Sequence, residues 1–246
     1  MSYIGQAYQN KLQYGWKRRL SHRVFLSIAA LGLVLTPPAG RGTEAATAQP
    51  GINASSPSSR AQQLRTTAKP EALIAEFNAT LLTVIRDAKA LGYAGRRDVL
   101  RKQLDDVYHF PVMARIAVGS HWRKLKPWQQ TTLVTHFGRL THATYASRFN
   151  GWTGEQFEMR GVQQVRAKTV LVKTAIIRPR DNPVEINYLM RQFHAGWKVI
   201  DIFLKGSYSE LATKRAEYSS ILRRQGFDAL IRQLDAKIAE YTKVPN

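Results

Sequence analysis

The sequence predicts an α+β fold in which helices pack on a mainly antiparallel sheet of four strands or slightly more. Between residues 70 and 150 apolar residues recur every three or four positions, the spacing of an amphipathic helix. Between residues 155 and 204 they largely alternate, which is typical of strands, and after residue 206 the helical spacing returns. Helices and strands in separate runs indicate an antiparallel sheet with helices packed against it.

The first run contains four predicted helices, at residues 70–91, about 97–108, 111–118 and 127–149. Proline favours the first turn of a helix and glycine favours its end, so Pro70 and Gly92 are expected to bound the first helix. Pro111 and Pro127 open the third and fourth in the same way. The apolar stripe of the first helix consists of Phe77, Leu81, Val84, Ile85 and Ala88.

Four strands are predicted next, at residues 155–166, 168–178, 184–193 and 196–204. They are rich in valine, isoleucine and threonine, and the turn sequences "RPRDNP" and "HAG" separate the last three from one another. Short turns of this kind join neighbouring antiparallel strands, which predicts a meander in chain order.

The last strand is apolar on both of its predicted faces. Strict alternation places Trp197, Val199, Asp201 and Phe203 on one face and Lys198, Ile200, Ile202 and Leu204 on the other. A strand of an antiparallel sheet normally has one solvated face. We therefore expect a second layer over this strand, formed by another helix or by a ligand.

Two further helices are expected after Gly206, separated by Gly226. Their apolar residues are Leu211, Tyr218, Ile221 and Leu222 in the first, and Leu230, Leu234, Ile238 and Tyr241 in the second. No change in composition divides this region. We therefore predict one domain over residues 70–246.

The N-terminal residues have the order of a secretory signal peptide. The basic residues Lys17, Arg18, Arg19 and Arg23 precede an apolar run from Val24 to Leu35, and "ATA" at residues 46–48 offers a cleavage site between small residues. We expect residues 1–48 to be a signal peptide and the polar residues 49–69 to be a flexible leader; an uncleaved membrane anchor is the alternative. In either case the domain lies outside the cytoplasm, and a periplasmic location is expected.

The chain is strongly basic and lacks cysteine. It has 37 Lys and Arg against 17 Asp and Glu, a formal charge of +20. Without residues 1–48, which hold six basic residues and one acidic residue, 31 basic and 16 acidic residues leave a charge of +15. Such a charge favours polyanions. An exported protein rarely meets nucleic acid, so anionic lipid and acidic proteins are the expected partners.

No motif of metal binding or catalysis is found. The six histidines have no metal-binding spacing, and neither a nucleophile elbow nor a phosphate-binding loop is present. Asp201 is the one acid within an apolar strand, and Arg178 or Tyr188 is its expected partner. Asp201 either makes a structural hydrogen bond or serves as an acid or base in an enzyme that acts on an apolar terpenoid.

Several short motifs together resemble one family. The residues that carry the resemblance are Phe110, Pro111, Met113, Ala114, Arg115, Gly119, Trp122, Pro127, Gln129, Gln130, Gly196, Trp197, Lys198, Val199 and Asp201. Across residues 70–240 the chain resembles the MlaC, or toluene-tolerance, family of periplasmic phospholipid-binding proteins. It is most similar to the HpnM branch, which is associated with hopanoid biosynthesis. It departs from the family at His109, where many relatives have an acid.

The resemblance implies a non-catalytic lipid carrier with an NTF2-like body and no cofactor or metal. Acyl chains or a hopanoid would lie in an apolar cavity between sheet and helices. The implied partners are an inner-membrane lipid transporter complex and an outer-membrane complex, and the basic charge in addition favours an anionic membrane surface. A structural or regulatory subunit of a membrane complex is a further alternative. The residues expected to line the cavity, which would serve equally well in an ordinary core, are Phe110, Met113, Ile116, Phe137, Leu140, Tyr145, Val170, Val172, Val184, Ile186, Tyr188, Val199 and Phe203.

Overall fold

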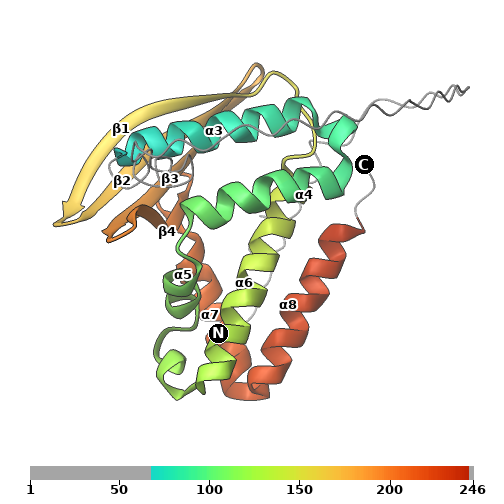
Figure 1. The fold of residues 1–246 in the computed structure, drawn as a ribbon, viewed down its shortest axis with the longest axis vertical. Helices are drawn as coiled ribbons and strands as arrows, with labels where there is room; N and C mark the ends of the chain where they lie inside the picture. Colours follow the sequence, from blue (N-terminus) through green and yellow to red (C-terminus); the bar gives the residue numbers. More distant parts are fainter. Residues whose placement is uncertain (1–67, 244–246) are drawn as a thin grey trace, which may run out of the picture. The chain divides into compact units, whose positions relative to one another are not determined.

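The computed structural model describes residues 68–243 (Figure 1). The predicted signal peptide, and the leader apart from its last two residues, lie outside the described residues. The described residues form six α-helices, one short 3₁₀ helix and a five-stranded sheet. The predicted α+β class is therefore confirmed.

The sheet is an antiparallel meander in which each strand pairs with the next one in the chain. Its four long strands correspond to the four that the sequence predicts, and the fifth is a two-residue addition at the edge. Their bounds are β1 Gln156–Arg166, β2 Thr169–Arg178, β3 Asp181–Phe193, β4 Gly196–Leu204 and β5 Tyr208–Ser209.

The helices differ from the prediction mainly near residue 90. The first helix ends at Arg86 rather than before Gly92, because the chain turns at Asp87. Gly92 instead forms a kink within the second helix, with φ 58°, a conformation that glycine adopts readily. The helices are α3 Pro70–Arg86, α4 Ala88–Val107, α5 Phe110–Val118, η1 Gly119–Lys124, α6 Pro127–Arg148, α7 Glu210–Gln225 and α8 Phe227–Thr242.

A β-bulge in β4 changes the predicted faces of that strand. Met190 pairs with Val199 and Leu189 pairs with Asp201, so Ile200 is the extra residue. An extra residue reverses the alternation beyond it. The prediction that Val199 and Asp201 share a face is therefore wrong.

The residues around the bulge are divided between the two faces of the sheet. Val199 and Ile202 lie on the face that the helices cover, together with Tyr188 of β3. Asp201 and Phe203 lie on the opposite face. The chain before α5 also runs along β4, where the His109 backbone N–H donates to the Val199 carbonyl at 2.9 Å.

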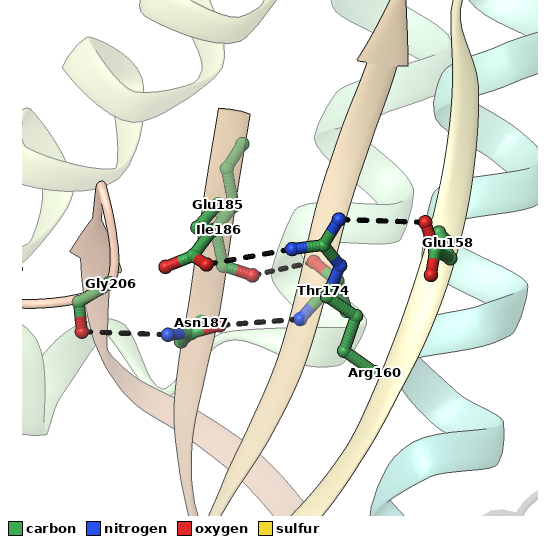
Figure 2. Close-up of polar contacts among 7 residues, drawn as sticks. All are labelled: Glu158, Arg160, Thr174, Glu185, Ile186, Asn187 and Gly206. Carbon is green, nitrogen blue, oxygen red and sulfur yellow. Dashed lines mark hydrogen bonds and ion pairs between the residues drawn. The ribbon is translucent and has the colours of Figure 1, made fainter. Parts of the chain in front are cut away.

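Polar contacts connect the strands on the opposite face (Figure 2). The Arg160 guanidinium lies 3.6 Å from the Glu158 carboxylate and 3.5 Å from that of Glu185 on β3. The Asn187 amide donates to the Gly206 carbonyl at 3.5 Å. Because Arg160 is the extra residue of a bulge in β1, this side chain reaches the opposite face without moving its apolar neighbours from the helix-facing face.

The hydrophobic core lies between the sheet and the helices. α3 contacts β1, β2 and β4, while α4, α5 and α7 each contact β4. Figure 1 shows α3 crossing the sheet, and α6, α7 and α8 extending away from it. The helix-facing core residues of the sheet are Val170, Val172, Ile176, Ile186, Tyr188, Met190, Val199 and Ile202.

Candidate functional site

Aromatic rings from four helices and one strand meet in the interior. The Phe77 ring of α3 lies with its centroid 5.8 Å from that of Tyr108, 5.9 Å from that of Tyr145 and 6.1 Å from that of Tyr188. Phe110 lies 5.9 Å from Tyr108, nearly edge-on. Such tilted contacts are favourable for aromatic pairs. They join helices α3, α5 and α6 and the end of α4 to strand β3 in one apolar interior.

Two tyrosine hydroxyls at the centre of this cluster bond each other. The hydroxyl oxygens of Tyr108 and Tyr145 are 2.5 Å apart. Burial raises the pKa of Tyr145 to about 12, and burial raises the pKa of Tyr108 well above its usual value. Both phenols therefore stay protonated at neutral pH, and the pair brings no charge into the interior.

Twelve of the thirteen predicted lining residues belong to this interior or pack against it. They come from both layers: Phe110, Met113, Ile116, Phe137, Leu140 and Tyr145 from the helices, and Val170, Val172, Val184, Ile186, Tyr188 and Val199 from the sheet. Phe203 is the exception, since its pairing with Asn187 places it on the opposite face. The part that these residues play in ligand binding stays a prediction.

An apolar strip on β1 extends the interior beyond the residues that the sequence singles out. Phe157, Met159 and Val162 form this strip, and their partners Ile176, Thr174 and Val172 place them on the helix-facing face. Met159 is 37% exposed and Val162 is 44% exposed, because β1 is an edge strand that the helices cover only in part. Two bulges in β1 interrupt its alternation, so the sequence does not reveal that these residues share a face.

Asp201 anchors a helix to the sheet. Its carboxylate accepts hydrogen bonds from the Ile202 backbone N–H at 2.7 Å, the Ser209 hydroxyl at 2.6 Å and the Leu211 backbone N–H at 3.2 Å. Ser209 in turn caps α7 by accepting from the Ala212 N–H at 2.9 Å. Burial raises the pKa of Asp201, and these three bonds oppose that rise.

The partners expected for Asp201 are wrong. Arg178 pairs with Asp181 at 3.2 Å, and Tyr188 lies on the helix-facing face, away from Asp201. The true partners are the next residue and the start of α7, which follows β4 after a short segment that contains β5. Because both carboxylate oxygens are occupied by structural donors, the geometry favours a structural role over catalysis.

Two histidines, like Asp201, make structural contacts. His142 Nε2 lies 2.9 Å from the Asp105 carboxylate, and His109 caps α5 by accepting from the Val112 N–H at 3.3 Å. Burial lowers the pKa of both histidines. Within residues 68–243, no three His, Asp or Glu side chains converge in a way that could hold a metal ion. None of the helices described is both long and apolar enough to cross a bilayer.

The interior is thus apolar and aromatic, and the polar groups described above hold the layers around it in place. The model of the MlaC protein family matches residues 75–236, and the chain belongs to this family. The fold is similar to that of a phospholipid-binding protein from Ralstonia solanacearum, solved in complex with a phospholipid. The TM-score is 0.64 at 21% identity, and the match covers 72% of this chain and 100% of the other.

Proposed function

We propose that the chain is a periplasmic carrier that holds the acyl chains of a phospholipid between its sheet and its helices. One observation carries the proposal: a member of the MlaC family has a continuous apolar interior that reaches the surface at an edge strand. The solved relative of the same fold, which binds a phospholipid, supports the choice of ligand.

The energetics explain why a carrier is needed. A diacyl lipid exposes about 30 methylenes, and each favours an apolar environment over water by about 0.8 kcal/mol. Exposing these chains to water during the crossing would therefore cost a free energy of roughly 24 kcal/mol. Burial alone overcomes this, and no covalent step takes part.

The apolar strip on β1 is the proposed entry for the acyl chains. Met159 and Val162 offer exposed apolar surface on the helix-facing side of β1, next to Phe157, which packs against the core, and α3 contacts this strand. The headgroup would stay outside, because the interior is apolar and the hydroxyls of Tyr108 and Tyr145 there already bond each other. The twelve interior residues named above would contact the chains.

Export by the signal peptide at residues 1–48 would bring this domain to the periplasm, preceded by the leader at residues 49–69. Membrane complexes that load and unload the carrier are its proposed partners, at the inner and the outer membrane. A hopanoid is the alternative cargo, since its fused rings have the same need for an apolar shield.

The first experiment is to purify residues 49–246 from a lipid-producing bacterial host and to identify copurifying lipids by native and denaturing mass spectrometry. Phospholipid at one molecule per chain is the expected result, and stoichiometric hopanoid would reassign the cargo. A ligand-free protein that also takes up no added lipid would refute the carrier.

Two adjacent substitutions on β1 locate the entry. Val162→Asp puts a charge on the helix-facing apolar strip, whereas Gln163→Asp puts the same charge on the opposite face of the same strand. Both positions are exposed, so both variants should fold. We expect Val162→Asp to lower lipid occupancy and Gln163→Asp to leave it unchanged. Equal occupancy in the two variants would place the entry elsewhere.

A further inference from the structure

The middle of the chain is devoid of acidic residues. From residue 107 to residue 154 there is no aspartate or glutamate, although the segment holds Arg115, Arg123, Lys124, Lys126, Arg139 and Arg148. Three of these, Arg123, Lys124 and Lys126, fall within four residues around the junction of η1 and α6, and all three are exposed. The positive charge of the domain is thus locally concentrated.

The fold adds a second basic pair to this junction. α7 contacts η1, and α6 packs along α8. Gly119, at the start of η1, lies so close to the Arg215 side chain of α7 that a Cβ there would be 2.6 Å from Nε. The exposed residues Arg223 and Arg224 lie in the last turn of α7. Figure 1 shows η1, the start of α6 and the α7–α8 turn together at the end of the helices away from the sheet.

An exposed tryptophan lies among these charges. Trp128 of α6 is 56% exposed, and its ring contacts Phe227 of α8 nearly edge-on, with centroids 5.7 Å apart. The contact holds the indole in place across two helices. We call Arg123, Lys124, Lys126, Trp128, Arg223 and Arg224 the basic end.

The charge of the basic end is not neutralised locally. Asp228 is the one carboxylate in the segments 119–130 and 221–230. Within the described part of the chain, no ion pair joins the five basic side chains to a carboxylate. Their charges therefore face solvent.

We propose that the basic end docks the protein on an anionic lipid bilayer. Arginine and lysine near a membrane are attracted by anionic headgroups, and tryptophan is enriched at the level of the headgroups. A basic surface alone would suit an acidic protein equally well. The exposed indole at its centre favours the bilayer, because its ring has an apolar body and a polar edge.

The docking surface is separate from the proposed cargo site. α6 begins in the basic end at Pro127 and ends at Arg148, shortly before β1. Its 22 residues make a helix about 33 Å long. A protein docked by its basic end would hold the apolar strip of β1 well away from the bilayer, so that the cargo is passed to a protein partner. The docking proposal adds to the proposed carrier but does not require that cargo be bound.

The test is vesicle flotation with the purified chain. One set of vesicles contains phosphatidylcholine with about 30 mol% phosphatidylglycerol and the other contains phosphatidylcholine alone. The first variant carries Arg123→Gln, Lys124→Gln and Lys126→Gln. The control variant carries Lys89→Gln, Lys102→Gln and Lys168→Gln, which removes the same charge from exposed positions elsewhere.

We expect wild-type protein to float with the anionic vesicles only, and less so at high salt. The first variant should lose roughly a hundredfold in partition coefficient, since each of its three basic residues near the surface contributes about a fivefold factor. The control variant should keep most of the binding. Trp128→Ala should weaken binding severalfold further at high salt, where electrostatic attraction is screened.

Two results would overturn the proposal. Wild-type protein that stays unbound at low salt would exclude docking on lipid and leave an acidic protein as the partner. Equal losses in the triple variant and in its control would show that net charge, and not the basic end, drives binding. Native mass spectrometry of the same samples reports cargo independently, so a protein that floats but neither copurifies with lipid nor takes up added lipid would refute the carrier and leave the docking surface intact.

Discussion

Replacing Asp201 by alanine should destabilise the protein strongly without altering its interior. The change removes three hydrogen bonds to one carboxylate and leaves the Leu211 N–H and the Ser209 hydroxyl without their acceptor. Hydrogen bonds to a charged group contribute about 1.5–3 kcal/mol each, and a helix cap about 1 kcal/mol. Because the ionised carboxylate also bears the free-energy cost of burial, we expect a net loss of about 3 kcal/mol in the free energy of unfolding.

Asp201→Asn separates the shape of this anchor from its charge. The asparagine oxygen can accept from both backbone N–H groups, and its amide can donate to Ser209, so the loss should be about 1 kcal/mol or less. The pKa of Asp201 is raised in the folded protein. Its contribution to stability is therefore complete below the unfolded pKa and declines as pH rises through the folded pKa. Relative to wild type, Asp201→Asn should lose more stability at acidic pH than at neutral pH.

Urea unfolding followed by circular dichroism measures both variants. With a slope of about 2 kcal/mol/M, Asp201→Ala should lower the midpoint by about 1.5 M. A midpoint within about 0.2 M of wild type would refute the anchoring role, and equal losses in the two variants would refute the argument from shape. Lipid occupancy should be unchanged in Asp201→Asn. Turnover of an apolar substrate that Asp201→Asn abolishes would instead restore the enzyme alternative.

Two further predictions concern buried polar pairs. Tyr145→Phe leaves the Tyr108 hydroxyl buried without its partner and should lower the free energy of unfolding by about 1–2 kcal/mol. Changing both tyrosines to phenylalanine should recover much of that loss. A double variant at least as unstable as the single one would contradict this. Burial lowers the pKa of His142, so the free energy of unfolding should fall as pH drops below the ordinary histidine value of 6.5, and His142→Asn should flatten this dependence in urea titrations at several pH values. An unchanged pH profile would show that His142 takes no part in it.

The sequence predicts the layers of the fold because each layer has its own period. The helical stripe around Phe77 and the alternation around Tyr188 identify helix and strand correctly, and most lining candidates fall in the interior for the same reason. Periodicity fails at Ile200, since a single extra residue in the strand leaves its composition unchanged but reverses its faces. Asp201 and Phe203 are consequently assigned to the wrong side.

Contacts between distant segments are the other feature of the structure that the local sequence pattern does not predict. Trp128 and Phe227 lie about a hundred residues apart, and the packing of α6 on α8 alone brings them together. The exposed apolar strip likewise follows from the place of β1 at the edge of the sheet, which strand order determines and local pattern does not. Site residues that depend on one element are thus predictable, and those that depend on assembly are not.

The bonded hydroxyls of Tyr108 and Tyr145 have a consequence for how cargo would be exchanged. Because the two hydroxyls bond each other, a hydrocarbon can enter or leave the interior without breaking that hydrogen bond. In the proposed carrier the dwell time of a lipid would then depend on the length of its chains and little on its headgroup or on pH. Each added methylene would lengthen the dwell time about fourfold, the factor that corresponds to about 0.8 kcal/mol.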